Sequence, residues 1–378
     1  MPPPKTGWIL RVRTPARPQL ATLPRQDRLY EIDLLRIIAA VAVMVYHYGF
    51  ADYAGGLTKE QYAGLDVVVR YGYLGVDLFF LISGFVVLLS AFGRTPRQFV
   101  TSRVTRLYPA YWVAVTFTAL TLVLLSQGQF TVTPLQFAAN ATMANSLVDQ
   151  PNIDVVYWTL WSELRFYVLV FALVCFGVTK NRVLWALWTW LGITFLLHAS
   201  VLPGAAQNLL SLVFQPDWAQ YFIAGMALCL VYRFGPSLQP VLIFLISYGY
   251  AVVVALDFAD DVAARYQTTI NLIVVLALVA AAFAVMMYVA LRLTGRFARP
   301  WFAALGALTY PLYLVHDRVG VVLFNRLDTV LNPWVVLGLV VALMVGLAWA
   351  AHRYVERPFA PVLKRAVTRV LSAKPAST

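Results

Sequence analysis

Long apolar runs alternate with short polar segments over most of the chain. Most of these runs reach the roughly 20 residues that a helix needs to cross a lipid bilayer. The runs cover residues 33–50, 72–92, 108–126, 156–178, 183–200, 217–232, 239–256, 268–291, 301–324 and 334–352. The pattern predicts an all-α integral membrane protein with about ten transmembrane helices, of which 217–232 is the shortest.

Composition supports a membrane protein. Hydrophobic residues make up 61% of the 378 residues and charged residues 12%, with a mean hydropathy of +0.73. Soluble chains are nearer half apolar and a quarter charged. These values exclude a disordered protein and argue against an ordinary soluble enzyme. The two cysteines, Cys175 and Cys229, both lie in apolar runs and indicate neither a disulfide framework nor a metal site.

The net charge of +12 does not indicate a nucleic-acid partner. Most basic residues lie in short segments between the apolar runs, which is the distribution expected beside a lipid bilayer. With the N-terminus inside, the cytoplasmic segments hold 22 basic residues and the outside loops hold 4. This bias predicts ten crossings with both termini in the cytoplasm.

The same topology divides the chain into three parts. Residues 1–28 are predicted as a disordered basic cytoplasmic arm, 29–358 as a ten-helix membrane domain, and 359–378 as a basic cytoplasmic tail. The longest outside connection is 127–155, in which Pro134–Leu147 is a candidate for a short interfacial helix.

Four titratable residues are predicted to share one layer in the outer half of the membrane: His47, Asp77, Glu163 and His316. Arg36 lies near the inner end of the first run. Ionisable groups inside membrane spans are costly and usually functional. A histidine beside a carboxylate in a dry cavity is a general-base arrangement. The alternative is that each group forms a structural hydrogen bond between helices.

Six short motifs occur in order along the predicted helices, and through them the chain resembles the membrane-bound acyltransferase family 3 from Tyr30 to Pro358. The motifs are Ile32–Arg36 with His47 eleven residues after Arg36, Gly75–Gly84, Arg103–Pro109, Trp158–Glu163, Thr309–His316 and Glu356–Pro358. The chain departs from the usual family pattern at Thr159, where serine is usual, and Arg165 follows Glu163 closely.

The resemblance implies transfer of an acyl group, usually acetyl, from cytoplasmic acyl-CoA to a hydroxyl of an extracytoplasmic glycan, glycolipid or related acceptor. It also implies a multi-pass protein of the bacterial inner membrane. The family's arginine and histidine pair falls on Arg36 and His47, its two clustered arginines on Arg103 and Arg106, and its glutamate on Glu163. The expected donor is acetyl-CoA, and no metal is expected.

These residues receive expected roles. His47 is the general base, Glu163 or Asp77 orients it, and Arg36 lines the donor's route. The CoA phosphates are expected to bind the guanidinium groups of Arg103 and Arg106, which share one helical face. The alternative is that these two arginines serve only to fix the membrane topology. The predicted donor site comprises Arg103, Arg106 and Tyr108, and weaker site-lining candidates are His316, Tyr310, Trp161 and Asp33, the last as a partner of Arg36.

Two other classes of function stay open at this point. Ten spans with buried charges also fit a secondary transporter without acyl-transfer activity, although no internal repeat is visible. A non-catalytic lipid scavenger or scaffold is the second alternative. The sequence leaves the acceptor, the acyl chain and the oligomeric state undetermined.

Overall fold

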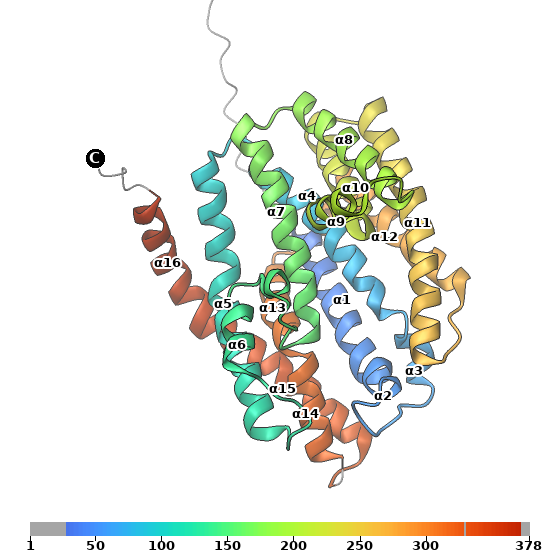
Figure 1. Ribbon diagram of the computed structural model, residues 1–378, viewed down its shortest axis with the longest axis vertical. Coiled ribbons are helices and arrows are strands. Elements are labelled where there is room, and N and C mark those ends of the chain that lie inside the picture. The colour runs from blue at the N-terminus through green and yellow to red at the C-terminus, as the bar shows by residue number, and fades with distance from the viewer. Residues whose placement is uncertain (1–27, 329, 372–378) are drawn as a thin grey trace, which may run out of the picture.

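The computed structural model describes residues 28–328 and 330–371, which form a bundle of helices without a strand (Figure 1). Most of the long helices run along the long axis of the molecule. The α-helices are α1 (Tyr30–Tyr46), α2 (Asp52–Ala54), α3 (Leu65–Val69), α4 (Gly75–Ala91), α5 (Pro96–Leu125), α6 (Pro134–Asn140), α7 (Trp158–Phe176), α8 (Lys180–His198), α9 (Gly204–Phe214), α10 (Pro216–Phe234), α11 (Leu238–Tyr266), α12 (Leu272–Ala290), α13 (Phe302–Val315), α14 (Asp317–Leu327), α15 (Pro333–Ala351) and α16 (Arg357–Val370). Short turns of other helix types are η1 (His47–Ala51), η2 (Gly72–Leu74), η3 (Asn145–Val148), η4 (Val155–Tyr157), η5 (Gly295–Phe297) and η6 (His352–Glu356).

The membrane character is confirmed, with a smaller number of clear spans than predicted. Within the described residues, seven helical segments are long and apolar enough to cross a bilayer. They are Tyr30–Ala54, Leu65–Ala91, Pro96–Leu125, Val155–Phe176, Leu238–Tyr266, Leu272–Ala290 and Pro333–Val370. Of the other predicted spans, α13 is apolar but shorter, and α8 and α10 are not among the seven. Ten crossings and the cytoplasmic placement of both termini stay predictions.

Helix α10 lies inside the bundle, packed against α4, α8, α11 and α12. Almost every side chain from Pro216 to Val231 is buried. Gly84 of α4 and Gly225 of α10 allow the two backbones to touch, because a Cβ at Gly225 would stand 2.1 Å from the carbonyl oxygen of Leu81. Small residues permit such close approach of membrane helices. Since protein surrounds α10 on most sides, its sequence does not need the apolar length of a lipid-facing helix.

The predicted division into arm, membrane domain and tail stays a prediction. Residues 1–27 of the predicted arm and 372–378 of the predicted tail lie outside the described residues. The part of the tail up to Val370 belongs to the helix α16. The predicted interfacial helix begins at Pro134, but α6 already ends at Asn140, and Asn145–Val148 forms a separate turn.

Basic side chains, among them Lys180 and Arg233, lie at one end of the bundle, which we call the basic end. The Arg233 guanidinium lies 4.3 Å from the centre of the Phe92 ring, and Lys180 Nζ lies 5.7 Å from that of Phe234. Helix α5 begins at this end. Helix α16 runs back along α5, because Glu356 and Ala360 lie near Arg106 whereas Thr368 contacts Arg97. The basic end is therefore the side that the sequence predicts to be cytoplasmic.

Candidate functional site

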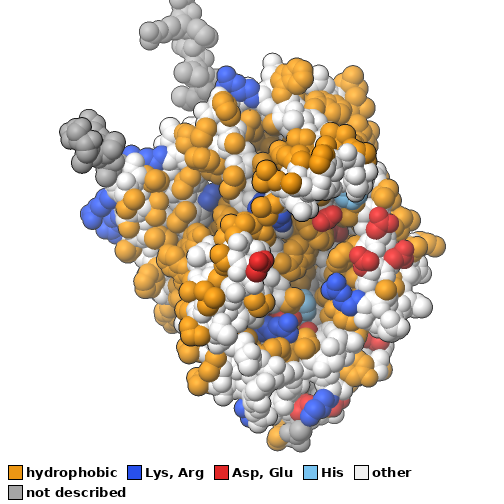
Figure 2. All heavy atoms as spheres, in the orientation of Figure 1, with side chains coloured by type: hydrophobic (Ala, Val, Ile, Leu, Met, Phe, Trp, Pro, Cys, Tyr) orange, Lys and Arg blue, Asp and Glu red, His pale blue; other side chains and the backbone are white. Residues whose placement is uncertain are grey.

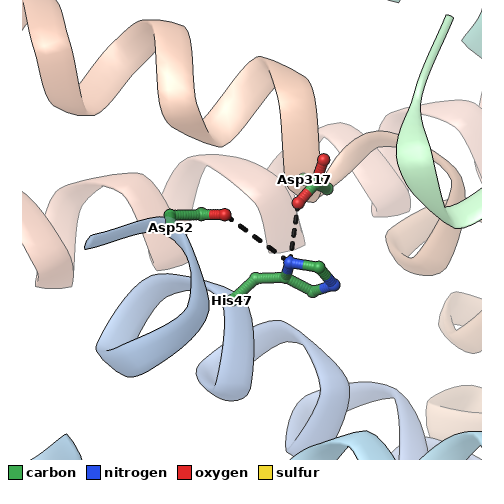
Figure 3. A group of neighbouring side chains, drawn as sticks. All are labelled: His47, Asp52 and Asp317. Atoms are coloured by element: carbon green, nitrogen blue, oxygen red, sulfur yellow. Dashed lines mark ion pairs between the residues drawn. The ribbon is translucent and has the colours of Figure 1, made fainter. Parts of the chain in front are cut away.

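His47 lies beside two buried aspartates, one close to it in sequence and one distant (Figure 3). Its Nδ1 atom is 2.7 Å from Oδ1 of Asp317 and 3.6 Å from Oδ1 of Asp52. The side chain of Asp317 is 1% exposed and that of Asp52 is 2% exposed. The Nε2 atom points away from both carboxylates (Figure 3). Asp317 thus favours the tautomer with its proton on Nδ1, which leaves Nε2 able to accept a proton.

A π-helical turn brings His47 and Asp52 together. At His47 the helix α1 widens into η1, and the backbone N–H of Asp52 donates to the carbonyl oxygen of His47, five residues earlier. In a regular α-helix five steps of about 100° would turn Asp52 well away from His47. Single π-helical turns occur frequently at functional sites.

Asp317 reaches His47 from the junction of α13 and α14. The Tyr48 hydroxyl donates to the carbonyl oxygen of His316 at 2.5 Å. The Nδ1 atom of His316 lies 2.9 Å from the carbonyl oxygen of Tyr313. Gly320 packs on the Tyr48 ring, where an added Cβ would be 2.5 Å from Cε1. The residue after His47 therefore fixes the helix junction that carries its carboxylate partner.

Two further charged residues lie around Asp317. The Arg318 side chain has Nε 3.7 Å from Oδ2 of Asp317, and its guanidinium is 4.8 Å from the centre of the Phe130 ring. The buried Asp154 carboxylate accepts hydrogen bonds from the backbone N–H of Arg318 and of Val156. The long connection 127–155 is thereby tied to the site. These buried carboxylates give His47 negative surroundings, which stabilise an imidazolium ion.

Three cavities follow one another from His47 toward the basic end, and we call them the connected cavities because neighbouring ones share lining residues. The His47 cavity, of about 130 Å³, is lined by His47, Asp77, Trp158, Trp218 and Tyr313 among others. The Glu163 cavity, of about 90 Å³, shares Val76 and Tyr313 with it. The Arg28 cavity, of about 490 Å³, shares Arg36, Arg106, Gly306 and Tyr310 with the Glu163 cavity. Figure 2 shows a hollow in the middle of one face, where charged and histidine side chains are visible among hydrophobic ones.

Glu163 is held by hydroxyl groups. The Tyr167 hydroxyl donates to its Oε1 atom at 2.5 Å, and the Ser83 hydroxyl donates to the same atom at 3.3 Å. Glu163 lines its cavity together with Arg36 and Arg106. Of the four residues predicted to share one layer, His47 and Asp77 line one cavity and the His316 ring centre lies 5.4 Å from that of His47, whereas Glu163 lines the next cavity with the arginines. Their common depth in a membrane stays a prediction.

The two arginines expected to bind CoA have different surroundings. Arg103 is 8% exposed, donates to the hydroxyls of Ser90 and Ser102, and lies 5.5 Å from the centre of the Tyr167 ring. Arg106 is exposed and lines both the Glu163 and the Arg28 cavities. Of this pair, only Arg106 faces the connected cavities, although the two residues are three positions apart on one helix.

The other predicted site residues occupy several places. Asp77 accepts a hydrogen bond from the Tyr221 hydroxyl at 2.9 Å. Tyr310 lines the Glu163 and Arg28 cavities, and its hydroxyl donates to the carbonyl oxygen of Leu107. The fully buried ring of His316 has its centre 5.4 Å from that of His47.

Three predicted site residues have partners outside the connected cavities or different from those expected. The Tyr108 hydroxyl donates to the carbonyl oxygen of Thr142, and the Trp161 ring lies 5.4 Å from the guanidinium of Arg165. Asp33 lines the Arg28 cavity but pairs with Arg28 at 2.6 Å, whereas its predicted partner was Arg36.

Sequence reasoning missed the two carboxylates nearest to His47. Asp52 follows His47 by five residues and lies just beyond the first apolar run, which ends at residue 50, and Asp317 directly follows the motif that ends at His316. A charged residue next to a histidine motif was a usable signal for Asp317. No α-helical spacing could have indicated Asp52, because its proximity depends on the π-helical turn.

His47, Asp52 and Asp317 also have the composition of a metal site, with ligand atoms within 4.8 Å of one another. Ligands of one Zn²⁺ ion stand about 2.0–2.2 Å from it in tetrahedral directions, which separates two ligand atoms by well over 3 Å. The 2.7 Å between His47 Nδ1 and Asp317 Oδ1 is instead a hydrogen-bond distance. The absence of a metal stays a prediction, and this spacing favours it.

The model of a family described as an acyltransferase domain matches residues 29–353. Neither a curated protein nor a solved structure gives a significant match. The matched range includes His47, Glu163 and Asp317, and it covers each of the three connected cavities apart from Arg28, Glu356 and Ala360.

Proposed function

We propose, from the premise that the chain belongs to the acyltransferase family 3, that it moves an acyl group across the membrane from acyl-CoA to a hydroxyl. The donor, most simply acetyl-CoA, would enter from the cytoplasm, and the acceptor would be an extracytoplasmic glycan, glycolipid or related molecule. The protein would work in the inner membrane of a bacterium. The observation that carries the proposal is the His47–Asp317 pair at one end of cavities that lead to the basic end.

His47 acts in this proposal as the general base. Its Nε2 atom takes the proton of the acceptor hydroxyl while the hydroxyl oxygen attacks the thioester carbonyl carbon. Collapse of the tetrahedral intermediate breaks the carbon–sulfur bond, and the imidazolium returns the proton to the departing CoA thiolate. Asp317, at 2.7 Å from Nδ1, fixes the tautomer and stabilises the imidazolium, so it takes the orienting role first assigned to Glu163 or Asp77.

The acyl arm of the donor would pass through the Glu163 cavity. Arg36 and Arg106 line this passage, and polar groups inside a membrane are tolerated where they line such a cavity. Glu163 balances the charge of the two arginines and is itself positioned by Tyr167. Arg103, whose guanidinium lies 5.5 Å from the centre of the Tyr167 ring, supports this arrangement without lining these cavities.

The acceptor would bind in the His47 cavity. Its wall contains Trp158 and Trp218, whose ring centres are 4.9 Å apart, with the Phe258 ring 5.9 Å from Trp218. Aromatic faces pack on the apolar faces of sugar rings, while buried polar groups such as the unpartnered Tyr73 hydroxyl can bind acceptor hydroxyls. This combination supports a sugar-containing acceptor.

A transfer assay tests the proposed function. Purified protein is mixed with acetyl-CoA labelled in the acetyl group and with a cell-envelope extract as the acceptor. We expect the label to enter an acceptor as an ester that mild alkali releases. A secondary transporter, the alternative function, would form no ester under these conditions and would instead move a solute across a vesicle membrane.

Replacing Arg106 tests the donor route. We expect Arg106→Ala to weaken acyl-CoA binding by roughly tenfold to a hundredfold, because a hydrogen bond to a charged group contributes about 1.5–3 kcal/mol. Titration of the purified variant with acyl-CoA measures this loss. The control is Arg103→Ala, which should lower the thermal stability more than the donor affinity, since Arg103 is buried. Donor binding by Arg106→Ala at the wild-type level would contradict the proposed route.

A further inference from the structure

A second basic cavity lies at the basic end, outside the passage described above. It runs between the first turns of α5 and the last turns of α16 and has a volume of about 710 Å³. We call it the α5–α16 groove, and its lining includes Arg94, Arg97, Thr101, Thr105, Lys364 and Thr368. Figure 2 shows basic side chains gathered at the outer edge of the molecule, at the position that α16 occupies in Figure 1.

The charge of the groove indicates an anionic ligand. Three cationic side chains, Arg94, Arg97 and Lys364, line it together with several hydroxyls and an amide, and no carboxylate of the described residues lines it. Arginine and lysine side chains are common phosphate ligands, arginine because its fork can bind two oxygens at once. The volume of about 710 Å³ falls within the range of small-molecule sites, roughly 300–1,000 Å³.

A buried hydroxyl group without a partner points to a ligand independently of the charge. Thr101 is 6% exposed, lines the groove, and its Oγ1 atom has no hydrogen-bond partner among the residues that the structure describes. One turn later, the hydroxyl of Thr105 donates to the carbonyl oxygen of Thr101 at 2.7 Å, which is the usual way in which a helix satisfies threonine. Burying a hydroxyl without a partner is unfavourable, so a ligand oxygen at Thr101 would stabilise the groove.

A hydrogen bond joins the two helices that form the groove, and the groove adjoins the donor route. An Arg97 side-chain nitrogen donates to the carbonyl oxygen of Thr368, which ties α16 to α5. Thr105 lines both the α5–α16 groove and the Arg28 cavity. A molecule in the groove could therefore extend past Thr105 toward Arg106 and the Glu163 cavity.

We infer that the α5–α16 groove binds the phosphorylated adenosine end of CoA, above all its 3′-phosphate, while the acyl-pantetheine arm extends through the Arg28 cavity. The inference rests on the proposed function, since it assumes a CoA donor. It assigns the two ends of that donor to different residues: Arg94, Lys364 and Thr101 bind the nucleotide phosphates, and Arg106 lies along the arm. An anionic lipid headgroup offers the same phosphate chemistry, so the test must separate these two sources.

The test compares acetyl-CoA with acetyl-3′-dephospho-CoA in titrations of purified protein in detergent. We expect wild-type protein to bind the dephospho compound tenfold to a hundredfold more weakly. The double variant Arg94→Ala/Lys364→Ala should bind both compounds equally and at the weaker level. Thr101→Val, which removes the hydroxyl but keeps the shape, should lose part of the preference. Arg299→Ala is the matched control, because Arg299 is exposed and its hydrogen bonds within the described part of the chain go to carbonyl groups of its own segment.

The outcomes distinguish the possible errors. A wild-type protein that binds acetyl-CoA without a preference for the 3′-phosphate would overturn the groove assignment and leave the proposed function intact. A wild-type protein that binds neither compound would overturn both. The anionic lipid is tested by repeating the acetyl-CoA titrations with protein in phosphatidylcholine vesicles, with and without phosphatidylglycerol. If the double variant keeps the preference for the 3′-phosphate but loses a response to phosphatidylglycerol, the groove binds a lipid headgroup and the inference is wrong.

Discussion

Replacing His47 with alanine should slow acyl transfer by about 10²–10⁴-fold, the usual contribution of a positioned general base. An alcohol hardly ionises at neutral pH, so its oxygen can attack a thioester only if its proton is removed as the new bond forms. His47 is suited to this task because its Nδ1 atom pairs with the Asp317 carboxylate, while its Nε2 atom points away from that carboxylate and can accept the proton. Transfer of labelled acetyl to an envelope extract measures the loss, and acyl-CoA titration should show that His47→Ala still binds the donor.

The pH dependence provides a second measurement of the same role. Because a protonated imidazole cannot accept another proton, the wild-type rate should fall toward acid pH, and the small residual rate of His47→Ala should lose this dependence. His47→Gln is a useful companion, since it keeps a polar side chain at the position. A folded His47→Ala protein that binds the donor and transfers within a few-fold of wild type would remove His47 from the mechanism. His316, with its ring centre 5.4 Å away, would then be the next candidate base.

Replacing Asp317 with asparagine should also lower transfer by about 10²–10⁴-fold, because the neutral amide can favour the wrong histidine tautomer and no longer stabilises the imidazolium. The substitution keeps the size of a side chain that is only 1% exposed, so the fold should be retained. Asp52→Asn should have a smaller effect, since Asp52 is 3.6 Å from Nδ1 whereas Asp317 is 2.7 Å away.

Double variants show whether Asp317 acts through His47. Residues that act as one unit lose activity in overlapping amounts, so Asp317→Asn/His47→Ala should be little slower than His47→Ala alone. Glu163→Gln provides the contrast, because the described hydrogen bonds of Glu163 come from Ser83 and Tyr167 in the neighbouring cavity. The fold-loss of transfer activity in Glu163→Gln should multiply with the fold-loss in His47→Ala when the two substitutions are combined. Multiplicative losses for Asp317 and His47 would show that Asp317 has a separate role.

The sequence by itself determined the membrane character, the positions of the main helices and the family, since hydropathy and six local motifs carry that information. It also predicted His47 as the general base, from its position inside an apolar run and from the spacing of the family's arginine and histidine pair, and that role stays a prediction. The apolar signal was weakest for α10, where burial within protein replaces contact with lipid. The number of crossings therefore depends on helices whose surroundings the sequence does not specify.

Only the tertiary structure decided which carboxylates lie beside His47. Depth along a helix suggested Glu163 and Asp77, but depth does not say which way a side chain faces or which helix stands opposite. Asp317 lies 270 positions away and reaches His47 only because the α13–α14 junction packs on Tyr48. Asp52 is near only because η1 departs from α-helical spacing. The different surroundings of Arg103 and Arg106 have the same physical reason, because they depend on the neighbouring helices. Arg103 lies against the Tyr167 ring, whereas Arg106 lines the Glu163 cavity, where a ligand could contact it.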